Sequence, residues 1–328
     1  MRHGPGDASD GHRRDVPAYA GPAHVRHVAK MNEHRWGGRM EHVLREIASQ
    51  PECWRRALEL GAAGPAGLPE AGERVAVIGC GTSLYMAQAY AVLRERSGQG
   101  ETDAFAASEL PARRYDRLVA ITRSGTTTEV LHALGAAGDI PTVAVTADPA
   151  TPVSGLAKTV IALEFADERS VVQTRFATSA LALLRAHLGE APADLAAQAE
   201  AALAAPLPEG ALSRRQFTFL GSGWTNGLAQ EAALKLRESA LAWSEAYPAM
   251  EYRHGPISIA DENSLVWFFG GPKELREELT RTGALTTVAE LDPLADLVRA
   301  QRLAVELSRS RGLDPDSPRN LSRSVILT

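Results

Sequence analysis

One structural unit occurs twice in this chain of 328 residues. The segment Val75–Ser83 (VAVIGCGTS) aligns with Phe217–Thr225 (FTFLGSGWT), 142 positions further on, and Gln88 in the sequence that follows then aligns with Gln230. Later segments align at similar spacings: Leu118-Val119 with Leu265-Val266, Thr142–Ala144 with Thr287–Ala289, and Asp148-Pro149 with Asp292-Pro293. A repeat of this kind indicates that one fold has been used twice.

Each copy has the order strand, glycine turn, helix, strand, turn, helix, strand. This alternation requires parallel strands joined by right-handed crossovers, with helices on both faces of the sheet. The length also exceeds a single domain of roughly 100–150 residues. We therefore predict an α/β fold made of two tandem, doubly wound parallel sheets.

The composition suggests where the domains begin and end. The first 30 residues are rich in Gly, Pro, Arg and His and lack the apolar stretch of a secretory signal, so residues 1–39 are predicted to be a disordered extension. Residues 40–207 would form the first domain with its preceding helices. Residues 208–328 would form the second, because a segment containing Pro and Gly (APLPEGALSRR) separates them.

Charge and cysteine content exclude several classes of protein. The net charge of -5 disfavours nucleic-acid binding, and the apolar runs stop well short of the roughly 20 residues of a membrane span. Cys53 and Cys80 are too few for a disulfide framework. Six of the nine histidines lie within the first 42 residues, at irregular spacing that favours a solvated tail over a metal site. We predict a cytoplasmic protein without a metal.

The segment Ile121–Glu129 combines a glycine with five hydroxyl side chains directly before a predicted helix. Parallel α/β sheets bind ligands at the carboxyl ends of their strands, where this segment lies. Free N–H groups, hydroxyls and the positive end of a helix dipole suit a phosphate monoester. An ordinary helix cap would explain one hydroxyl, but five of them beside Arg123 favour a phosphate.

The segment Gly79–Ser83 partly resembles a dinucleotide-binding turn. Leu84 stands where the third glycine would be, and no GxxxxGK[ST] occurs, so neither NAD nor a Walker-type nucleotide is expected. Thr82 and Ser83 would face the same phosphate or the sugar hydroxyls. The alternative is a tight turn with no ligand.

Glu231, Lys235 and Glu238 are spaced so that they share one face of a helix. Such a set is commonly a solvated salt-bridge stripe. This helix follows the second glycine turn, however, and its first turns should line the cleft, where burial and a neighbouring lysine make a tunable base. His254 lies in an Arg-His-Gly-Pro turn and is either structural or a general acid/base.

The segments CGTS, RSGTT, EAALKLRES, HGP and PRNLSRSV together resemble the sugar isomerase (SIS) family. The resemblance is to the doubled isomerase half of glucosamine-6-phosphate synthase and to stand-alone amino-sugar-phosphate isomerase/deaminases. It covers roughly Met40 to the C-terminus. It implies two flavodoxin-like SIS subdomains, no metal or organic cofactor, and a homodimer with sites at the interface.

The resemblance also implies roles for individual residues. By match to the family, the residues that would hold a sugar 6-phosphate are Thr82, Ser83, Thr122, Ser124 and Thr127, and the chemistry of the loop adds Arg123. Glu238 would move a proton between C1 and C2, Lys235 would assist it, and His254 would open the sugar ring from the partner subunit. Gln173, in a loop that touches the substrate in this family, is a weaker candidate.

Two departures from the family pattern shape the expected activity. The synthase's amidotransferase domain and its nucleophilic cysteine are missing, so no glutamine amidotransferase activity is expected. Arg323 stands where the synthase has the lysine that forms an imine, and arginine is no amine nucleophile. Arg323 therefore remains a candidate substrate contact, and proton transfer by Glu238 is unaffected.

These features predict a phosphosugar aldose–ketose isomerase or an amino-sugar-6-phosphate deaminase. Two alternatives remain: a non-catalytic sugar-phosphate sensor and a fructosamine-6-phosphate deglycase. Sensors of this family normally carry a helix-turn-helix, and neither the residues before Met40 nor the net charge supports one.

Overall fold

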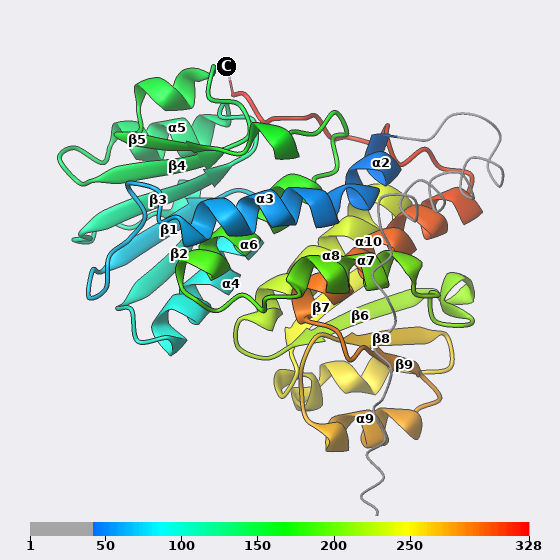
Figure 1. Cartoon of the computed structure of the whole chain (residues 1–328). Coiled ribbons are helices and arrows are strands. Elements are labelled where there is room, and N and C mark those ends of the chain that lie inside the picture. Colours follow the sequence, from blue (N-terminus) through cyan, green and yellow to red (C-terminus); the bar gives the residue numbers. More distant parts are fainter. Residues whose placement is uncertain (1–41, 328) are drawn as a thin grey trace, which may run out of the picture. The chain divides into compact units, whose positions relative to one another are not determined.

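The computed structural model describes residues 42–327, which form two parallel β-sheets (Figure 1). The first sheet has the strand order β2-β1-β3-β4-β5 and the second the order β7-β6-β8-β9. All strand pairs are parallel. In both sheets the first strand of the unit lies between the second and the third. The predicted doubly wound fold, used twice, is confirmed.

The elements have the following bounds. The strands are β1 (Val75–Gly79), β2 (Thr102–Ala106), β3 (Arg117–Thr122), β4 (Thr142–Thr146), β5 (Thr159–Ala162), β6 (Gln216–Gly221), β7 (Ser244–Pro248), β8 (Ser264–Phe268) and β9 (Leu285–Val288). The α-helices are α2 (His42–Ala48), α3 (Gln50–Ala62), α4 (Thr82–Arg96), α5 (Thr128–Gly135), α6 (Arg175–His187), α7 (Leu195–Ala204), α8 (Thr225–Ala240), α9 (Lys273–Thr280) and α10 (Pro293–Ser310). Short 3₁₀ turns are η1 (Ala107–Glu109), η2 (Pro152–Gly155), η3 (Glu164–Ala166), η4 (Ala211–Ser213), η5 (Glu251–His254) and η6 (Pro256–Ile259).

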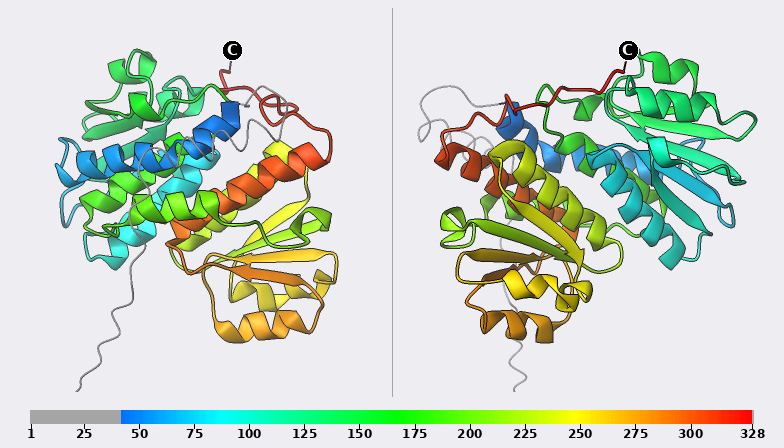
Figure 2. Two further views of the ribbon diagram at one scale, coloured as in Figure 1. Left: turned by 45° about the vertical axis from the view of Figure 1, so that its right-hand side comes forward. Right: turned by 180° about the vertical axis from the view of Figure 1, so that it is seen from behind.

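One hydrophobic core joins the inner faces of the two sheets. It is built from α3, α4, α6, α7, α8 and α10, which lie between the sheets (Figure 2). Two smaller clusters cover the outer faces, beneath α5 on the first sheet and α9 on the second. Because both faces are covered, β1, β4 and β8 are buried along their whole length.

The strand register corrects the sequence alignment of the two halves by one residue. β1 pairs Ala76 with Leu118, and β6 pairs Thr218 with Val266. Since Ala76 and Thr218 are equivalent, Leu118 matches Val266 and not Leu265. A shift of one residue exchanges the two faces of a strand, and both Leu118 and Val266 lie in the outer clusters.

The next pair of strands shows the same shift. Thr142 pairs with Leu118 and Thr286 with Val266, so Thr142 matches Thr286 and not Thr287. The physical reason is that β3, β4 and β8, which are buried on both faces, show no alternation of polar and apolar residues. Their sequences therefore cannot fix which residue faces which way.

Helices α4 and α8 occupy equivalent positions in the two halves and pack against each other. The side-chain amides of Gln88 and Gln230 form a hydrogen bond of 3.2 Å. Equivalent residues can touch only near the axis that relates the two halves, so this axis passes close to the contact between α4 and α8. Tyr85 and Gly227, also equivalent, meet at the same crossing: a Cβ at Gly227 would lie 2.4 Å from the Tyr85 carbonyl oxygen.

We predict that Gly227→Ala destabilises the protein, because the added methyl group would push the two helix backbones apart. The expected loss in the free energy of unfolding is about 1–3 kcal/mol, as for other overpacked cores. Urea denaturation measures it. Gly135→Ala, in α5, is the matched control, since a Cβ there meets nothing within 4 Å. Equal stability of both variants would contradict the close crossing.

Two further expectations concern the ends of the fold. The predicted disordered extension, residues 1–39, lies outside the described residues. The predicted domain boundary at residues 207 and 208 lies in the connection between α7 and β6.

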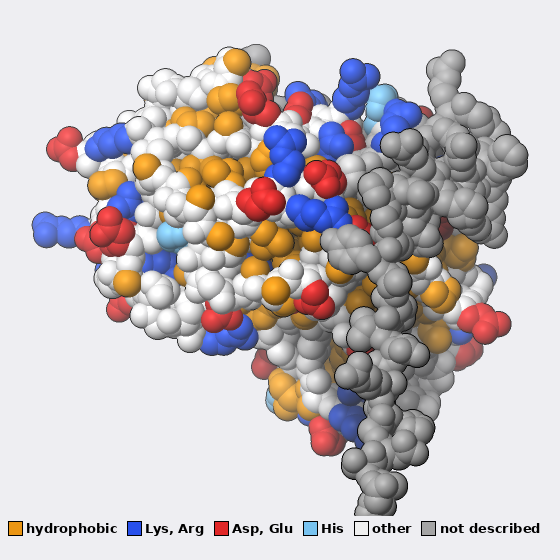
Figure 3. Space-filling model, in the orientation of Figure 1, with side chains coloured by type: hydrophobic (Ala, Val, Ile, Leu, Met, Phe, Trp, Pro, Cys, Tyr) orange, Lys and Arg blue, Asp and Glu red, His pale blue; other side chains and the backbone are white. Residues whose placement is uncertain are grey.

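Within residues 42–327, no helix is long and apolar enough to cross a membrane. On the face shown in Figure 3, acidic and basic side chains are intermixed around α2 and α3.

Candidate functional site

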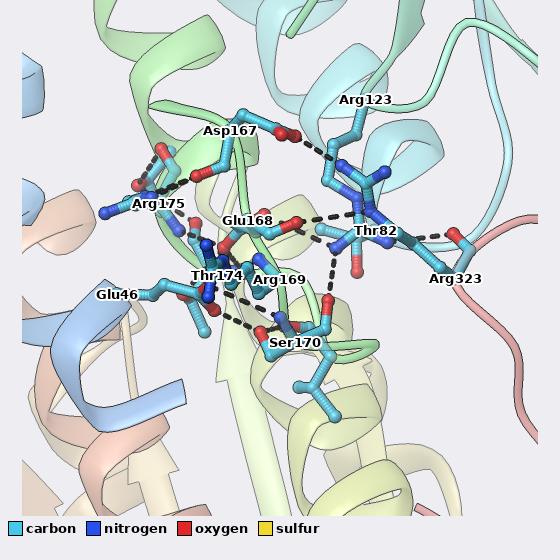
Figure 4. Close-up of polar contacts among 12 residues, drawn as sticks. Glu46, Thr82, Arg123, Asp167, Glu168, Arg169, Ser170, Thr174, Arg175 and Arg323 are labelled. Carbon is cyan, nitrogen blue, oxygen red and sulfur yellow. Dashed lines mark hydrogen bonds and ion pairs between the residues drawn. The ribbon is translucent and has the colours of Figure 1, made fainter. Parts of the chain in front are cut away.

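The two loops predicted to hold phosphate leave the same edge of the first sheet. β1 leads into α4, which begins at Thr82, and the neighbouring β3 leads into α5, which begins at Thr128. Figure 4 includes Thr82 and Arg123, one from each of these loops. The predicted residues Thr82, Ser83, Thr122, Arg123 and Ser124 are buried, and Thr127 is partly buried.

Lys235 lies at the centre of a buried cluster that joins the two halves. Its Nζ is 2.6 Å from Glu238 Oε2, 2.9 Å from Thr82 Oγ1 and 3.3 Å from Glu231 Oε1. The side chains of Lys235 and Glu231 are each 1% exposed, whereas that of Glu238 is 18% exposed. These exposures exclude a solvated stripe, and only Glu238 presents a carboxylate to solvent.

Burial sets the charges in this cluster. It raises the pKa of Glu231 to about 8, although Lys235 opposes the rise. Burial alone would lower the pKa of Lys235, but Glu231 and Glu238 together raise it above the usual value. A cluster of one ammonium and two carboxyl groups has no net charge when one of the carboxyl groups keeps its proton. Glu231, which lies deepest, is the one that keeps it.

We predict that the effect of Glu231→Gln on stability depends on pH. Folded Glu231 keeps its proton up to about pH 8, whereas the unfolded chain loses it near 4.5. The unfolded state therefore binds fewer protons in this window, and Glu231 makes the free energy of unfolding fall as pH rises. Gln does not titrate, so the free energy of unfolding of the variant minus that of wild type should increase from about pH 5 to about pH 8. Urea denaturation at several pH values measures this difference, and a constant difference would show that folded Glu231 is ionised.

Hydroxyl groups converge in the loop between β3 and α5. Ser124 and Thr126 each donate a hydrogen bond to the Oγ of Ser324, at 3.1 and 2.9 Å, and Thr127 Oγ1 lies 3.5 Å from it. Gly125 permits this loop, because its φ is +61° and a Cβ would lie 2.0 Å from Oγ1 of a neighbouring threonine. The loop ends at α5, so the positive end of the helix dipole faces the hydroxyls.

Arg123 binds two backbone carbonyl oxygens. Its guanidinium is buried and donates to the carbonyl oxygens of Ser170 (2.9 Å) and Arg323 (2.8 Å). It also lies 3.6 Å from Glu168 Oε2. These contacts tie three segments together (Figure 4), and the predicted phosphate contact of Arg123 remains a prediction.

Two buried glutamates hold the loop that contains Gln173. Glu168 accepts hydrogen bonds from the backbone and hydroxyl of Thr174, at 2.6 and 2.8 Å, and its pKa is raised by burial, against the effect of Arg123. Glu46, on α2, accepts from the backbone and hydroxyl of Ser170. Among the described residues, Gln173 Oε1 is buried without a hydrogen-bond partner.

The remaining predicted residues lie apart from the Lys235 cluster. His254 is exposed in η5 and, within the described part of the chain, forms no hydrogen bond or ion pair with that cluster. The Arg323 side chain contacts Asp167 and the carbonyl oxygen of Glu168. Residues 42–327 contain no group of His, Cys, Asp and Glu that could hold a metal.

Sequence reasoning missed two functional contributors. Ser324 lies among the loop hydroxyls, and its only signal was its place beside Arg323 in the PRNLSRSV segment. Glu46 lies far from the loop in sequence and carried no signal, because a carboxylate in a short helix is usually solvated. A cavity of about 570 Å³ on the outer face of the first sheet contains none of the predicted site residues.

Known proteins share this architecture and its order of elements. No protein-family model matches the chain. The glutamine–fructose-6-phosphate aminotransferase (isomerizing) of Gloeobacter violaceus is 29% identical over 355 positions, which cover 87% of this chain and 58% of that enzyme. A glucosamine-6-phosphate deaminase structure from Thermotoga maritima has a TM-score of 0.73 at 25% identity, covering 88% of this chain and 100% of that one. This chain has the sugar isomerase (SIS) fold.

The other comparisons agree with the SIS fold. The structure of tagatose-6-phosphate ketose/aldose isomerase from Escherichia coli has a TM-score of 0.67 at 21% identity, covering 84% of this chain and 95% of that one. This chain spans only 58% of the length of the Gloeobacter relative. The resemblance to the isomerase part of the synthase is thereby confirmed.

Proposed function

We propose that this SIS chain is a sugar 6-phosphate aldose–ketose isomerase or an amino-sugar-6-phosphate deaminase. The observation that carries the proposal is the partly exposed Glu238 carboxylate, held 2.6 Å from the buried Lys235 ammonium. The same lysine is bonded to Thr82, at the edge of the sheet where the hydroxyl loop lies. A base and a phosphate-binding loop thus belong to one site.

Both reactions begin with a proton moving between C1 and C2 of an open-chain sugar phosphate. Glu238 would take the proton from one carbon and return it to the next, as a general base and then a general acid. Lys235 would fix one carboxylate oxygen and stabilise the negative charge that develops on the substrate oxygen. Glu231 is too deeply buried to touch a substrate and acts as a positioning residue for Lys235.

The phosphate would bind at the hydroxyls of Ser124, Thr126 and Thr127 and at the first turn of α5. Thr82, Ser83 and Thr122 would complete this region, and Gln173 would offer its unpaired amide oxygen to the sugar. We assign ring opening to His254 across the interface of a cytoplasmic homodimer. Its exposure in one chain is consistent with that role.

The two solved relatives support different reactions within this class. The Thermotoga relative is a deaminase by name, and the Escherichia relative is a ketose/aldose isomerase. Hexose, hexosamine and fructosamine 6-phosphates, assayed in parallel for ammonia release and ketose formation, separate these activities from deglycation. A chain that binds these compounds without turnover or proton exchange would be a sensor.

We predict that Glu238→Gln lowers turnover by about 10²–10⁴-fold, because the amide cannot accept the proton. In deuterium oxide, wild type should exchange the C1 or C2 hydrogen of its substrate and the variant should not, while calorimetry should show unchanged binding of the sugar phosphate. Glu209→Gln, at an exposed carboxylate outside the site, is the control. An active Glu238→Gln enzyme would assign the proton to another group.

We predict that Ser124→Ala combined with Thr127→Ala weakens sugar-phosphate binding by at least about 10²-fold. Each hydroxyl lost removes a hydrogen bond to a charged group, worth about 1.5–3 kcal/mol. Isothermal titration calorimetry measures the Kd. Ser154→Ala, which removes an exposed hydroxyl from η2, should leave the Kd unchanged. An unchanged Kd in the double variant would rule out phosphate binding by this loop.

A further inference from the structure

The cavity of about 570 Å³ on the outer face of the first sheet lies between α5 and the segment that joins β2 to β3. Ala76 and Leu118 line it from the sheet, and Ala133 and Ala137 line it from the helix side. Small-molecule sites occupy about 300–1,000 Å³ and are mostly apolar, with a few polar groups. The cavity therefore has the size and the lining of a site for a small ligand.

In the second half, a buried aromatic side chain packs beneath α9, the helix equivalent to α5. Both helices are eight residues long, and each is buried at its third and seventh positions: Val130 and Leu134 in α5, and Leu275 and Leu279 in α9. Tyr252, which is 0% exposed, belongs to the same cluster as the two leucines of α9. The fold thus places an aromatic ring beneath this helix.

The residue after Tyr252 is a cation that contacts the same helix. Arg253 donates to both carboxylate oxygens of Glu278 on α9, at 2.8 and 2.9 Å. The residue of α5 equivalent to Glu278 is Ala133, which lines the cavity. In the second half, an aromatic ring and a positive charge therefore both contact the helix, where the first half has a cavity.

The corresponding segment of the first half is shorter and is bound elsewhere. Residues 107–116 join β2 to β3, whereas residues 249–263 join β7 to β8. The Tyr115 hydroxyl donates to Asp103 at 2.7 Å, and Arg113 lies 3.7 Å from the same carboxylate. Asp103 is on β2, the edge strand of the sheet. The aromatic ring and the cation of this segment are thus bound to β2, and the space beside α5 is left open.

Glu129 gives the cavity an acceptor without a partner. It is the second residue of α5 and lines the cavity, and its Oε2 is buried without a hydrogen-bond partner among residues 42–327. A buried acceptor of this kind costs free energy that a donor would recover. The two cationic side chains that also line the cavity, Arg113 and His132, are exposed to solvent, which screens their charge.

We propose that this cavity binds a small aromatic cation, with its ring on Ala76 and Leu118 and its ammonium group bonded to Glu129. The ligand would supply the aromatic ring and the positive charge that the segment after β7 supplies in the second half. None of the residues of the hydroxyl loop or of the Lys235 cluster lines the cavity. The site is therefore separate from the proposed active site and does not rest on the proposed function.

Binding of 2-phenylethylammonium to the full chain, measured by calorimetry, tests the site. We expect a Kd of about 1 mM or tighter, which a ligand of this size reaches in a formed cavity. Neutral 2-phenylethanol has the same size and should bind at least about tenfold more weakly, because only the ammonium donates a charged hydrogen bond. Equal binding of the two probes, or no binding of the ammonium at about 10 mM, would overturn the proposal.

A change of the carboxylate tests its role. Glu129→Gln should weaken binding of 2-phenylethylammonium at least about tenfold and leave that of 2-phenylethanol unchanged. Glu274→Gln is the matched control, because Glu274 is exposed at the equivalent position of α9 and should not affect either probe. Unchanged ammonium binding in Glu129→Gln would overturn the proposal.

A change of the cavity volume tests its location, and Glu129→Gln decides if this variant fails to fold. Ala133→Leu should abolish binding of both probes by filling the cavity, whereas Ala201→Leu, at an exposed position of α7, should not. An ammonium that still binds to folded Ala133→Leu lies elsewhere, for example at the partly exposed Glu238, and overturns the proposal. A Kd that rises with protein concentration would assign the cavity to a second copy of the chain and overturn it as well.

Discussion

The buried ammonium of Lys235 is the constraint on which the site depends. A charged group enclosed in this way must be compensated, and Lys235 finds its partners in both halves of the chain: Glu231 and Glu238 on its own helix and Thr82 on the equivalent helix of the other half. The contact forms because α4 and α8 cross closely at Gly227. The close packing of α4 against α8 therefore also brings Thr82 into contact with Lys235.

Duplication has produced two similar α/β units but only one candidate site in the described part of the chain. At the positions equivalent to Glu231, Lys235 and Glu238, helix α4 carries alanine, leucine and arginine. In the second half, the sequence after β8 reads FGGPKE, without the hydroxyls that follow β3. The residues proposed for acid–base chemistry thus come from one half and the hydroxyl loop from the other. A single half of the fold could not supply both.

Segments outside the sheets complete the site. Asp316 accepts hydrogen bonds from the backbone N–H groups of His42 and Val43 at the start of α2. Glu46, on the same helix, holds the loop at Ser170, and Arg123 connects that loop to the last residues of the chain. Each segment in this series is hydrogen-bonded to the next. A change at either end therefore alters the position of the hydroxyl loop.

The sequence by itself determined the duplicated α/β fold, the loop of hydroxyls before a helix, and the shared face of Glu231, Lys235 and Glu238. Repetition and the helical period are local signals, and they survive in one sequence. Only the tertiary structure decided the register of the buried strands, the protonation of Glu231, the partners of Arg123 and the place of Ser324 in the loop. Each of these depends on contacts between residues distant in the chain. The spacing of residues along the chain does not show which side chains become buried or which charged groups become partners.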